Sequence, residues 1–566
     1  MPPHSPSHTA PDESAAPPAQ PSAAAATSRS AIDTRQLPGL NRLAVDYAWD
    51  FGRLERFFAG NPADPQAWRD AVARVQAHAR PREAVAAVIE AQQRRRGAPA
   101  EALAATARLR EAATVAIVTG QQAGLFGGPL FTLLKALTAV RLAERVRAEQ
   151  HVPAVAVFWI DAEDHDWNEV RTCHVLDAEL GLRSVSLADL PGCHTESVGR
   201  LQLDASIEAA TAELEALLPP SASTADVLAA VRTAYQAGLS MADAFGRLLE
   251  QVLGPRGLIV YDASDPAAKP FVADLFAREV EFAGATCRRA AGTGAALEAA
   301  GYHAQVAAPS DGLALFSLAS GRQGIRVNGG NCVIGDREEP AADLLARVRT
   351  QPEAFGPNVL LRPLVQDTIL PTVCYVAGPS ELAYLGQLRE VYGAFDVPMP
   401  LVYPRATATL LDSNAARFLA RHALPLGALR AQDESVLNDL LAAALPPSVD
   451  ASLQAAGQAI EDRMSALAAD VLAIDATLEG ATRSAMGRMQ DDLKKLQGKI
   501  IQAAKRKDET LRRQFRHAQA QAYPGGHSQE REIGLVYFLN KYGPSLVDRL
   551  CEELPLGMGT HWVLTI

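Results

Sequence analysis

Carboxylates and a single imidazole crowd into one short stretch of this chain, DAEDHDWNEV at residues 161–170. Nine consecutive positions hold five carboxylates and one histidine: Asp161, Glu163, Asp164, His165, Asp166 and Glu169. Like charges at this spacing repel one another unless a metal, another cation or a polyhydroxyl ligand compensates them. A histidine between carboxylates can act as a general base. The stretch therefore predicts a catalytic or ligand-binding loop, and the alternative is a solvated acidic loop that caps the next helix.

A glycine-rich stretch, TGQQAGLFGGP at residues 119–129, lies between a predicted strand and a predicted helix. Its four glycines permit positive φ angles and a close approach of the backbone to a ligand. The helix opened by Pro129 offers free N–H groups that suit a phosphate or carboxylate. The stretch is neither a P-loop nor a GxGxxG motif. Because Gln121 and Gln122 fall where open α/β sheets bind ligands, we predict a ligand loop, with a tight unliganded turn as the alternative.

A third group of polar residues lies beside apolar runs in the second half of the chain. Arg362, Gln366 and Asp367 offer a cation, an amide and a carboxylate. An arginine can hold a carboxylate or phosphate in a bidentate fork, although a structural Arg–Asp pair explains the pattern equally well. Arg405 is open to the same two interpretations. The sequence GPS at residues 378–380 predicts a turn into a helix, with its serine as the N-cap.

Alternating strands and helices are predicted to position these residues. Short apolar runs predict six strands, at residues 113–120, 154–160, 257–262, 313–318, 372–378 and 400–404. Helical segments lie between several of them, and the first runs are apolar on both faces, as strands of a covered parallel sheet are. The predicted fold class is α/β, a doubly wound and mainly parallel sheet with inserted segments and a long α-helical coiled coil.

Composition divides the chain into segments. We expect a disordered Pro/Ala/Ser-rich tail at 1–36, a helical segment at 37–112, a catalytic core at 113–432 with insertions near 173–251 and 263–310, a coiled coil at 433–521, and a segment at 522–566 that returns to the core. In the coiled coil the apolar residues step by four and three, with one break near Gly480 and Gly487. The break allows either a kinked long helix or a two-helix hairpin.

Charge and composition exclude several classes of protein. A net charge of −11 argues against binding to nucleic acid or to anionic membranes, and no apolar run approaches the ~18 residues of a membrane span. Basic residues between Lys494 and Arg516 are interpreted as a solvated coiled-coil face, because acidic residues interleave with them. Six scattered cysteines without a CxxC pair favour a reducing cytoplasm over a disulfide framework or a zinc site.

Several long motifs resemble those of one known family, the bacillithiol-biosynthesis cysteine ligases called BshC. They stand in the same order: TGQQAGLFGGPLFTLLKA, VFWIDAEDHDWNEV, PNVLLRPLVQDTILPT, YVAGPSELAYLGQL, VPMPLVYPRATATLL and FLNKYGPSLVDRL. The resemblance runs from about Leu37 to the C-terminus. It implies a Rossmann-like core, a coiled coil that joins two chains as a homodimer, and the coupling of cysteine to glucosaminyl-malate in the last step of bacillithiol synthesis.

The resemblance also implies roles for particular residues. ATP, accompanied by Mg²⁺, would activate the carboxylate of cysteine. Phosphate contacts are expected from Gly120, Gln121, Gln122, Gly127, Gly128 and Lys135. Catalysis is expected from His165 as the base, from Asp164 or Asp166 as its orienting partner, and from Glu163. Substrate contacts are expected from Arg362, Gln366, Asp367, Gly378, Tyr384 and Arg405. Asp161 falls where the family has variable small residues, so no role is transferred to it.

Two further functions remain as alternatives. A metal-dependent hydrolase, such as an amino-sugar deacetylase, would use the carboxylates and His165 as ligands. Only one histidine lies in that stretch, however, so we assign no metal ligands. A non-catalytic coiled-coil dimer that binds a nucleotide and scaffolds other enzymes is the second alternative, because a coiled coil serves dimerisation in either case.

Overall fold

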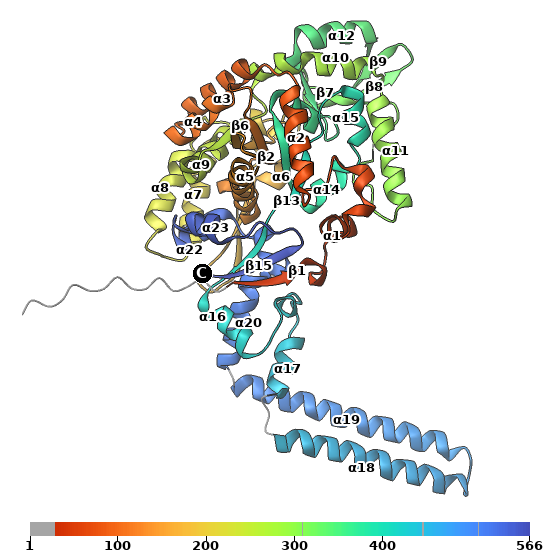
Figure 1. Ribbon diagram of the computed structural model, residues 1–566. Helices are drawn as coiled ribbons and strands as arrows, with labels where there is room; N and C mark the ends of the chain where they lie inside the picture. Colours follow the sequence, from red (N-terminus) through yellow and green to blue (C-terminus); the bar gives the residue numbers. More distant parts are fainter. Residues whose placement is uncertain (1–28, 308, 444–446, 508) are drawn as a thin grey trace, which may run out of the picture.

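The computed structural model describes residues 29–566 apart from residues 308, 444–446 and 508. A compact body carries a projecting arm of two helices, α18 (Pro447–Leu472) and α19 (Leu478–Lys507) (Figure 1). None of the described helices is both long and apolar enough to cross a lipid bilayer.

Five parallel strands form the central sheet of the body. Its order is β13 (Leu401–Pro404), β12 (Thr372–Ala377), β2 (Val115–Gln121), β3 (Ala154–Ile160) and β6 (Leu258–Asp262). The chain runs outward from β2 through β3 to β6, and then returns to the other side of β2 with β12 and β13. The strand order therefore reverses between β2 and β12, the kind of position at which open α/β sheets leave a crevice for a ligand.

Both faces of this sheet are buried, because successive side chains of a strand point to opposite faces. In β2, Val115 and Ile117 belong to one hydrophobic cluster, and Ala116 and Val118 belong to the other. Helix α5 (Leu130–Gln150) connects β2 to β3 and packs on the first of these faces. The predicted doubly wound parallel sheet is confirmed.

One of the six predicted strands belongs to a different sheet. Residues 313–318 correspond to β7 (Gly312–Ser317), which pairs antiparallel with both of its neighbours. Its sheet has the order β10 (Arg337–Pro340), β9 (Asn331–Ile334), β8 (Gln323–Asn328), β7 and β11 (Phe355–Pro357). The run resembled a strand of the parallel sheet because β7 is largely buried, whereas the short strands that pair with it carry no comparable apolar run.

The two ends of the described chain meet in a three-stranded sheet. Strand β15 (Thr560–Thr565) pairs in parallel with β14 (Thr407–Leu411) and antiparallel with β1 (Arg29–Asp33). The predicted disordered tail, residues 1–36, lies outside the described residues as far as residue 28. For residues 29–33 that prediction is wrong, because β1 finds its partner more than 500 residues later in the sequence.

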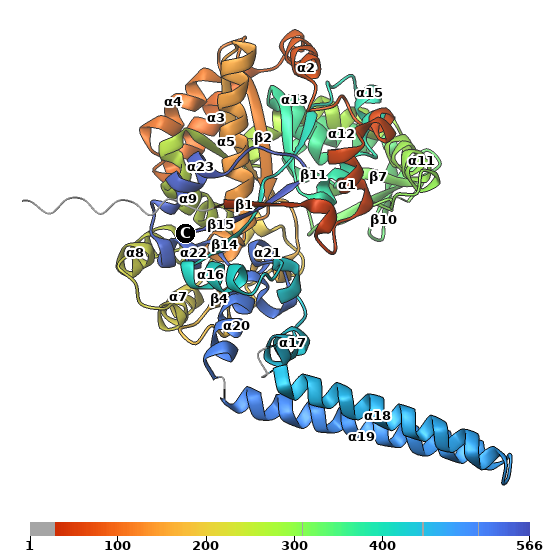
Figure 2. The same ribbon diagram turned by 60° about the horizontal axis from the view of Figure 1, so that its bottom comes forward.

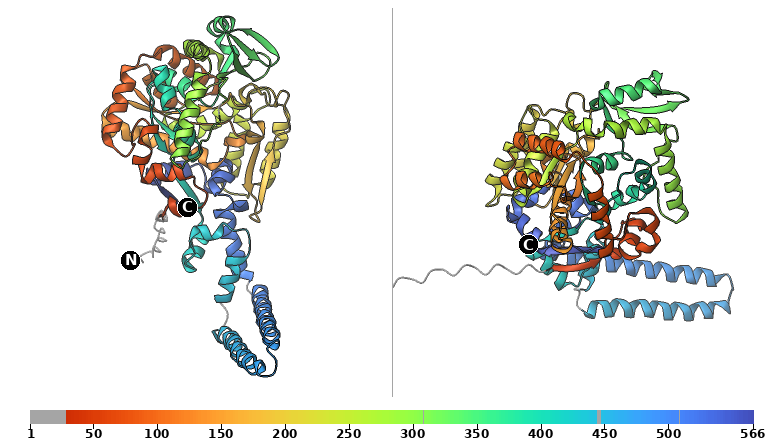
Figure 3. Two further views of the ribbon diagram at one scale, coloured as in Figure 1. Left: turned by 90° about the vertical axis from the view of Figure 1, so that its right-hand side faces the viewer. Right: turned by 45° about the horizontal axis from the view of Figure 1, so that its top comes forward.

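The arm resolves the alternative that the sequence left open. Helices α18 and α19 pack against each other as a hairpin, with the reversal at residues 473–477 (Figure 2). The reversal precedes the break predicted near Gly480 and Gly487, and both glycines lie inside α19. Helices α17 (Ser435–Ala443) and α20 (Glu509–Ala522) stand at the base of the arm, where the chain leaves and re-enters the body (Figure 3).

Further helices surround the sheets. The N-terminal helices are α1 (Arg42–Trp49), α2 (Pro65–Ala77), α3 (Arg82–Arg96) and α4 (Ala100–Arg108). Between β3 and β6 the chain forms α6 (Trp167–Val170), β4 (Thr172–Leu176), β5 (Leu182–Ser186), α7 (Ser206–Leu217), α8 (Thr224–Ala234) and α9 (Met241–Leu253), and all but α6 belong to the first predicted insertion. Later helices are α10 (Ala273–Glu281), α11 (Ala285–Ala299), α12 (Ala341–Thr350), α13 (Arg362–Ile369), α14 (Pro379–Leu385), α15 (Arg389–Phe395), α16 (Ser413–Arg421), α21 (Gln529–Glu532), α22 (Leu535–Tyr542) and α23 (Leu546–Glu553).

Candidate active site

A cavity of about 380 Å³ opens at the carboxyl ends of β2, β3 and β12. Gly120 and Gln121 end β2, Asp161 follows β3, and Tyr375 and Gly378 mark the end of β12. The cavity thus lies where the strand order reverses, and its size falls within the usual range of small-molecule sites. Its lining is rich in charges of both signs. We call the group around Lys135, Glu381 and Arg362 the inner wall, and the group formed by Gln122, Asp164, His165 and Arg322 the outer wall.

A buried ion pair forms the base of the inner wall. Lys135 Nζ of α5 lies 2.5 Å from Glu381 Oε2 of α14 and donates to the carbonyl of Gly120 at 2.7 Å. Burial lowers the pKa of the Lys135 ammonium, and Glu381 opposes that effect. Burial would raise the pKa of Glu381, but the charge of Lys135 and three hydrogen bonds outweigh it and hold the pKa below its usual value. At 2.5 Å the two groups form a close ion pair in which each charge compensates the other.

The start of α14 explains how Glu381 reaches this position. Gly378 is the N-cap, Pro379 occupies the first helical position, and the Glu381 carboxylate accepts the N–H of Gly378 at 2.7 Å. The hydroxyl of Tyr375 donates to the other carboxylate oxygen at 2.7 Å. The prediction that Ser380 caps this helix is wrong. Gly378 can be the N-cap without a side chain, because the capping hydrogen bond comes from the side chain of the third helical residue, Glu381.

Arg362 joins the inner wall to the loop that follows β3. The arginine opens α13 and is buried, and its Nη2 donates to the hydroxyl of Tyr384 at 2.7 Å. Its Nε lies 3.5 Å from Asp161 Oδ2. Burial raises the pKa of Asp161, while Arg362 counteracts it and the neighbouring Asp164 and Glu381 add to it. Asp161, to which the resemblance gave no role, therefore belongs to the pocket.

The outer wall is a hydrogen-bonded chain of four residues, Gln122, Asp164, His165 and Arg322, of which His165 is exposed and the others are half-buried. Asp164 accepts from Gln122 at 2.6 Å and from the backbone N–H of His165 at 2.7 Å. Burial would raise the pKa of Asp164, but these hydrogen bonds and the charge of Arg322 lower it. His165 Nδ1 lies 3.2 Å from Asp164 Oδ1 and 3.1 Å from Arg322 Nη1. The carboxylate requires a proton on Nδ1 and the guanidinium requires a lone pair there, so the two contacts select opposite tautomers.

Two other acidic residues of the predicted catalytic loop, Asp166 and Glu163, have structural partners. Asp166 is the N-cap of α6 and accepts the N–H of Glu169 at 3.1 Å. Glu163 is buried against Lys269 in a close ion pair, and burial raises the pKa of its carboxyl while Lys269 opposes the rise. The loop is therefore divided: Glu163, Asp164 and Glu169 line the cavity, whereas Asp166 caps the following helix. His165 does not line the cavity, but it contacts Asp164 and Arg322, which do.

The glycine-rich loop contributes only its first part. Gly120, Gln121 and Gln122 line the cavity, but Gly127 and Gly128 do not. The N–H of Gly127 donates to the hydroxyl of Tyr235 at 3.0 Å, and the carbonyl of Gly128 accepts from Leu535. The first N–H of α5, from Leu130, donates to the carbonyl of Ile533 at 2.9 Å. The C-terminal segment therefore occupies the helix N-terminus that the sequence predicted for a phosphate.

The remaining predicted substrate residues also separate into two groups. Gly378, Tyr384 and Arg405 line the cavity beside Arg362. Arg405 also forms a buried ion pair with Glu530 at 2.6 Å. Gln366 and Asp367 do not line the cavity but lie in the core, where Asp367 accepts from Tyr392 at 2.5 Å and from Gln366 at 2.8 Å. Burial raises the pKa of Asp367 to about 6.

Several residues that line the cavity were not predicted from the sequence: Phe131, Arg322, Asn358, Tyr375, Glu381 and Arg531. Glu381 carried a signal, because a glutamate three positions after Gly378 fits a helix cap. Arg322 carried none. Arg322 lies in the turn between β7 and β8, and the sheet that contains these strands was not predicted from the sequence. No neighbouring residue therefore indicated that Arg322 contacts His165.

Family models match almost all of the described chain. The description "Bacillithiol biosynthesis BshC, N-terminal Rossmann-like domain" covers residues 29–406, and "Bacillithiol biosynthesis BshC, C-terminal coiled-coil domain" covers residues 408–566. The chain belongs to the BshC family. A relative from Salinibacter ruber is 35% identical over 93% of this chain and 96% of its own. Relatives from Koribacter versatilis and Geobacillus kaustophilus are 34% and 30% identical, over 92% and 93% of this chain and 97% and 98% of theirs.

These relatives carry the name "Putative cysteine ligase BshC", which agrees with the family inferred from the motifs and with a biosynthetic ligase. The metal-hydrolase alternative predicted ligands in the loop of residues 161–170. Within the described part of the chain, the grouping of three potential metal ligands lies elsewhere, at Asp189, Cys193 and His194.

Proposed function

We propose that the cavity binds cysteine and glucosaminyl-malate and joins them by an amide bond, which completes bacillithiol. The observation that carries this proposal is the pairing of opposite charges around one crevice. Buried Arg362 and its cationic neighbours suit carboxylates, whereas Asp161 and Asp164 suit ammonium groups. Cysteine has one group of each kind, and glucosaminyl-malate has an amine and two carboxylates, so both substrates complement such a lining.

Amide formation from a free carboxylate requires activation, and ATP would supply it. The donor set of the cavity fits a polyphosphate, because four arginines line it: Arg322, Arg362, Arg405 and Arg531. The loop at Gly127 and Gly128 does not fit, since its N–H groups donate within the protein. Asp161 and Asp164 supply the oxygen ligands that a phosphate-bound Mg²⁺ prefers. Burial and, to a smaller extent, the charge of Asp164 raise the pKa of Asp161, and a cation there would counteract both effects.

His165 is the residue best placed to take the proton of the attacking amine. Its ring is 54% exposed, and its Nδ1 contacts two residues that line the cavity, Asp164 and Arg322. The contact with Asp164 places the proton on Nδ1 and leaves Nε2 free to accept a proton. Proton transfer by a positioned imidazole is an ordinary route of general base catalysis at neutral pH.

The proposal extends to a homodimer joined through the arm. Six of the eight large apolar side chains exposed in the described residues lie on this hairpin: Leu467, Leu472, Ile474, Leu478, Met489 and Leu496. Exposed apolar surface of this extent marks an interaction site, and a second copy of the hairpin would cover it. Six free cysteines agree with a cytoplasmic location.

The test is mass spectrometry of a reaction that contains the purified chain, cysteine, glucosaminyl-malate and ATP with Mg²⁺. Bacillithiol should appear only when ATP is present, and light scattering of the same sample should give twice the mass of the chain. Arg362→Lys should lower kcat/KM about a hundredfold, because lysine cannot form the planar fork. The matched control is Arg74→Lys, at an exposed arginine outside the cavity. Absence of product in every condition, or equal rates for the two variants, would contradict the proposal.

A further inference from the structure

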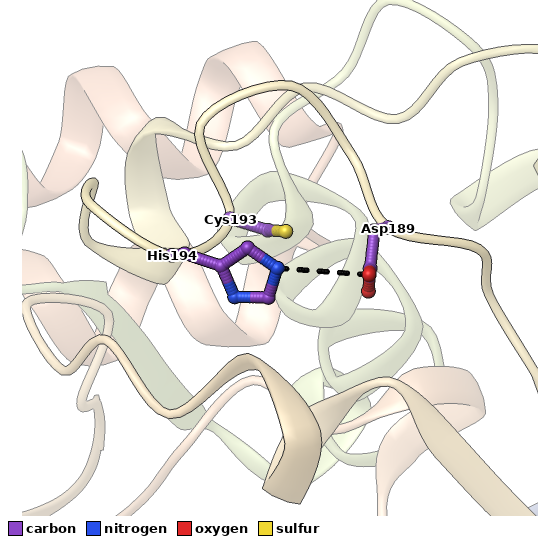
Figure 4. Close-up of side chains that lie close together, drawn as sticks. All are labelled: Asp189, Cys193 and His194. Atoms are coloured by element: carbon purple, nitrogen blue, oxygen red, sulfur yellow. Dashed lines mark ion pairs between the residues drawn. The ribbon is translucent and has the colours of Figure 1, made fainter.

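The loop between β5 and the turn at Val198–Arg200 brings three dissimilar side chains together. The chain reverses in a tight turn at Pro191-Gly192. Gly192 has a φ of +84°, and the N–H of Cys193 donates to the carbonyl of Leu190 at 3.1 Å. This reversal turns Cys193 and His194 back toward Asp189 (Figure 4). A thiol, an imidazole and a carboxylate, separated by only a few residues of sequence, thus face one point.

The spacing of the three groups suits a metal ion. One sulfur, one nitrogen and one oxygen atom all lie within 4.8 Å of one another. His194 Nε2 lies 3.6 Å from Asp189 Oδ2. Bonds of about 2.0–2.3 Å to a tetrahedral zinc ion place two ligand atoms roughly 3.3–3.7 Å apart, so this pair already has the required separation.

The surroundings of the three groups also fit. The second carboxylate oxygen of Asp189 accepts a hydrogen bond from Arg171, which fixes the orientation of the carboxylate as outer partners of metal ligands do. Cys193 is buried, whereas His194 and Asp189 are 70% and 53% exposed. A surface His–Asp pair contributes little to stability on its own. The exposed side leaves an entry path for an ion and room for a water molecule as the fourth ligand.

We propose that Asp189, Cys193 and His194 bind one Zn²⁺ ion. A thiolate combined with an imidazole selects zinc over Mg²⁺ and Ca²⁺, which prefer all-oxygen sites. On binding, the Cys193 thiol releases its proton to solvent and the metal–sulfur bond forms. The expectation from sequence was that no zinc site exists, because the cysteines are scattered. The site uses only one of them.

The bound ion would stabilise the outer wall of the cavity. Past the three ligands, the same loop donates from Val198 N–H to the carbonyl of Asp164 and from Gly199 N–H to the carbonyl of Ala162, each at 2.7 Å. The carbonyl of Thr195 accepts from the N–H of Arg322 at 3.0 Å. Residues 195–199 are therefore hydrogen-bonded both to the acidic loop at residues 162–164 and to Arg322, which flank His165. An ion that fixes residues 189–194 would in turn restrict the motion of the acidic loop and of Arg322. This role is structural and does not depend on the proposed ligase reaction.

The test is a titration of the full-length, reduced protein with Co²⁺, followed by the absorption of cobalt–thiolate charge transfer. One equivalent should bind, and Zn²⁺ should displace it. His194→Ala, at an exposed position that folding does not require, should weaken binding about tenfold or more, and Cys193→Ser should abolish the thiolate band. The matched control is Cys551→Ser, at a partly exposed cysteine outside the cluster. No thiolate band, or a band that only the control removes, would overturn the proposal.

Hydrogen exchange tests the structural consequence. Zn²⁺ should slow amide exchange at residues 189–200 and at Arg322 in the wild type but not in His194→Ala. Binding of one Zn²⁺ without slower exchange in these segments would contradict the stabilising role, even if the site itself is real.

Discussion

The two walls of the cavity are built in different ways. The inner wall consists of charges that come from helices and strands of the core, and the Lys135 side chain is only 3% exposed. The outer wall consists of loop residues, and the His165 side chain is 54% exposed. Lys135 and Arg362 of the inner wall are buried and contact groups of the core, whereas the outer wall depends on neighbouring loops from the first insertion and from the second sheet.

This difference separates stability from reactivity. A charge in the inner wall has lost its water and depends on its partner, so it cannot be changed without a large cost in folding free energy. A charge in the outer wall retains solvent, so it can gain or lose a proton while the fold persists. The inner wall is thus suited to hold substrate groups at fixed positions, and the outer wall is suited to proton transfer.

The largest effect is expected from breaking the buried pair. Lys135→Met leaves the Glu381 carboxylate charged and without its cation, which should lower the free energy of unfolding by about 3–5 kcal/mol. The double variant Lys135→Met/Glu381→Gln removes both charges and keeps an acceptor for the N–H of Gly378, so it should recover most of this loss. Urea denaturation of the three proteins measures both effects.

The control for this comparison is an exposed pair. Arg232 and Glu215 lie 2.5 Å apart with about half of each side chain in solvent. Arg232→Met should cost less than about 1 kcal/mol, as surface pairs do. If Lys135→Met cost no more than Arg232→Met, the inner wall would not be the rigid part of the cavity.

A pH-dependent effect of intermediate size is expected just behind the inner wall, at Asp367. Its pKa of about 6 lies above the ordinary value of 3.8, because the carboxyl is fully buried. Between pH 4 and pH 6 the folded chain keeps this proton while the unfolded chain has lost it. Stability should therefore fall as the pH rises through this window, by about 3 kcal/mol at about 1.4 kcal/mol per pH unit.

Asp367→Asn removes the titrating group and should flatten this part of the stability profile. Thermal or urea unfolding at several pH values, with the wild type alongside, isolates the contribution of Asp367 from those of other carboxyls such as Glu279, whose pKa burial raises to about 7. Parallel slopes for the two proteins would show that Asp367 is ionised in the fold and that its buried position does not control its protonation.

The walls also differ in how far sequence could predict them. The strands that end at the cavity were predictable, because β2, β3 and β12 are continuous apolar runs followed by polar or glycine-rich residues. Arg362 was predicted as a binder of carboxylate or phosphate from its residue type and from the family motifs, whereas Tyr384 was found through the family motifs alone. Gly127 and Gly128 were wrongly expected to contact phosphate. The segment that covers them, Ile533–Leu535, lies some 400 residues later in the sequence, so no local pattern could indicate the contact. Asp367 was assigned to substrate because burial of a carboxylate cannot be read from its neighbours.

The smallest effect on stability, combined with a large effect on catalysis, is expected at His165. His165→Ala removes a ring that is 54% exposed, so the free energy of unfolding should change by less than about 0.5 kcal/mol. Under the proposed function, loss of the general base should lower kcat about a hundredfold. His303→Ala, at an exposed histidine that does not line the cavity, should change neither quantity.

Two outcomes would contradict this prediction. If His165→Ala instead unfolded the chain, the outer wall would be required for stability, as the inner wall is. If it kept full activity, the proton of the amine would have to leave by another route, such as a carboxylate that lines the cavity.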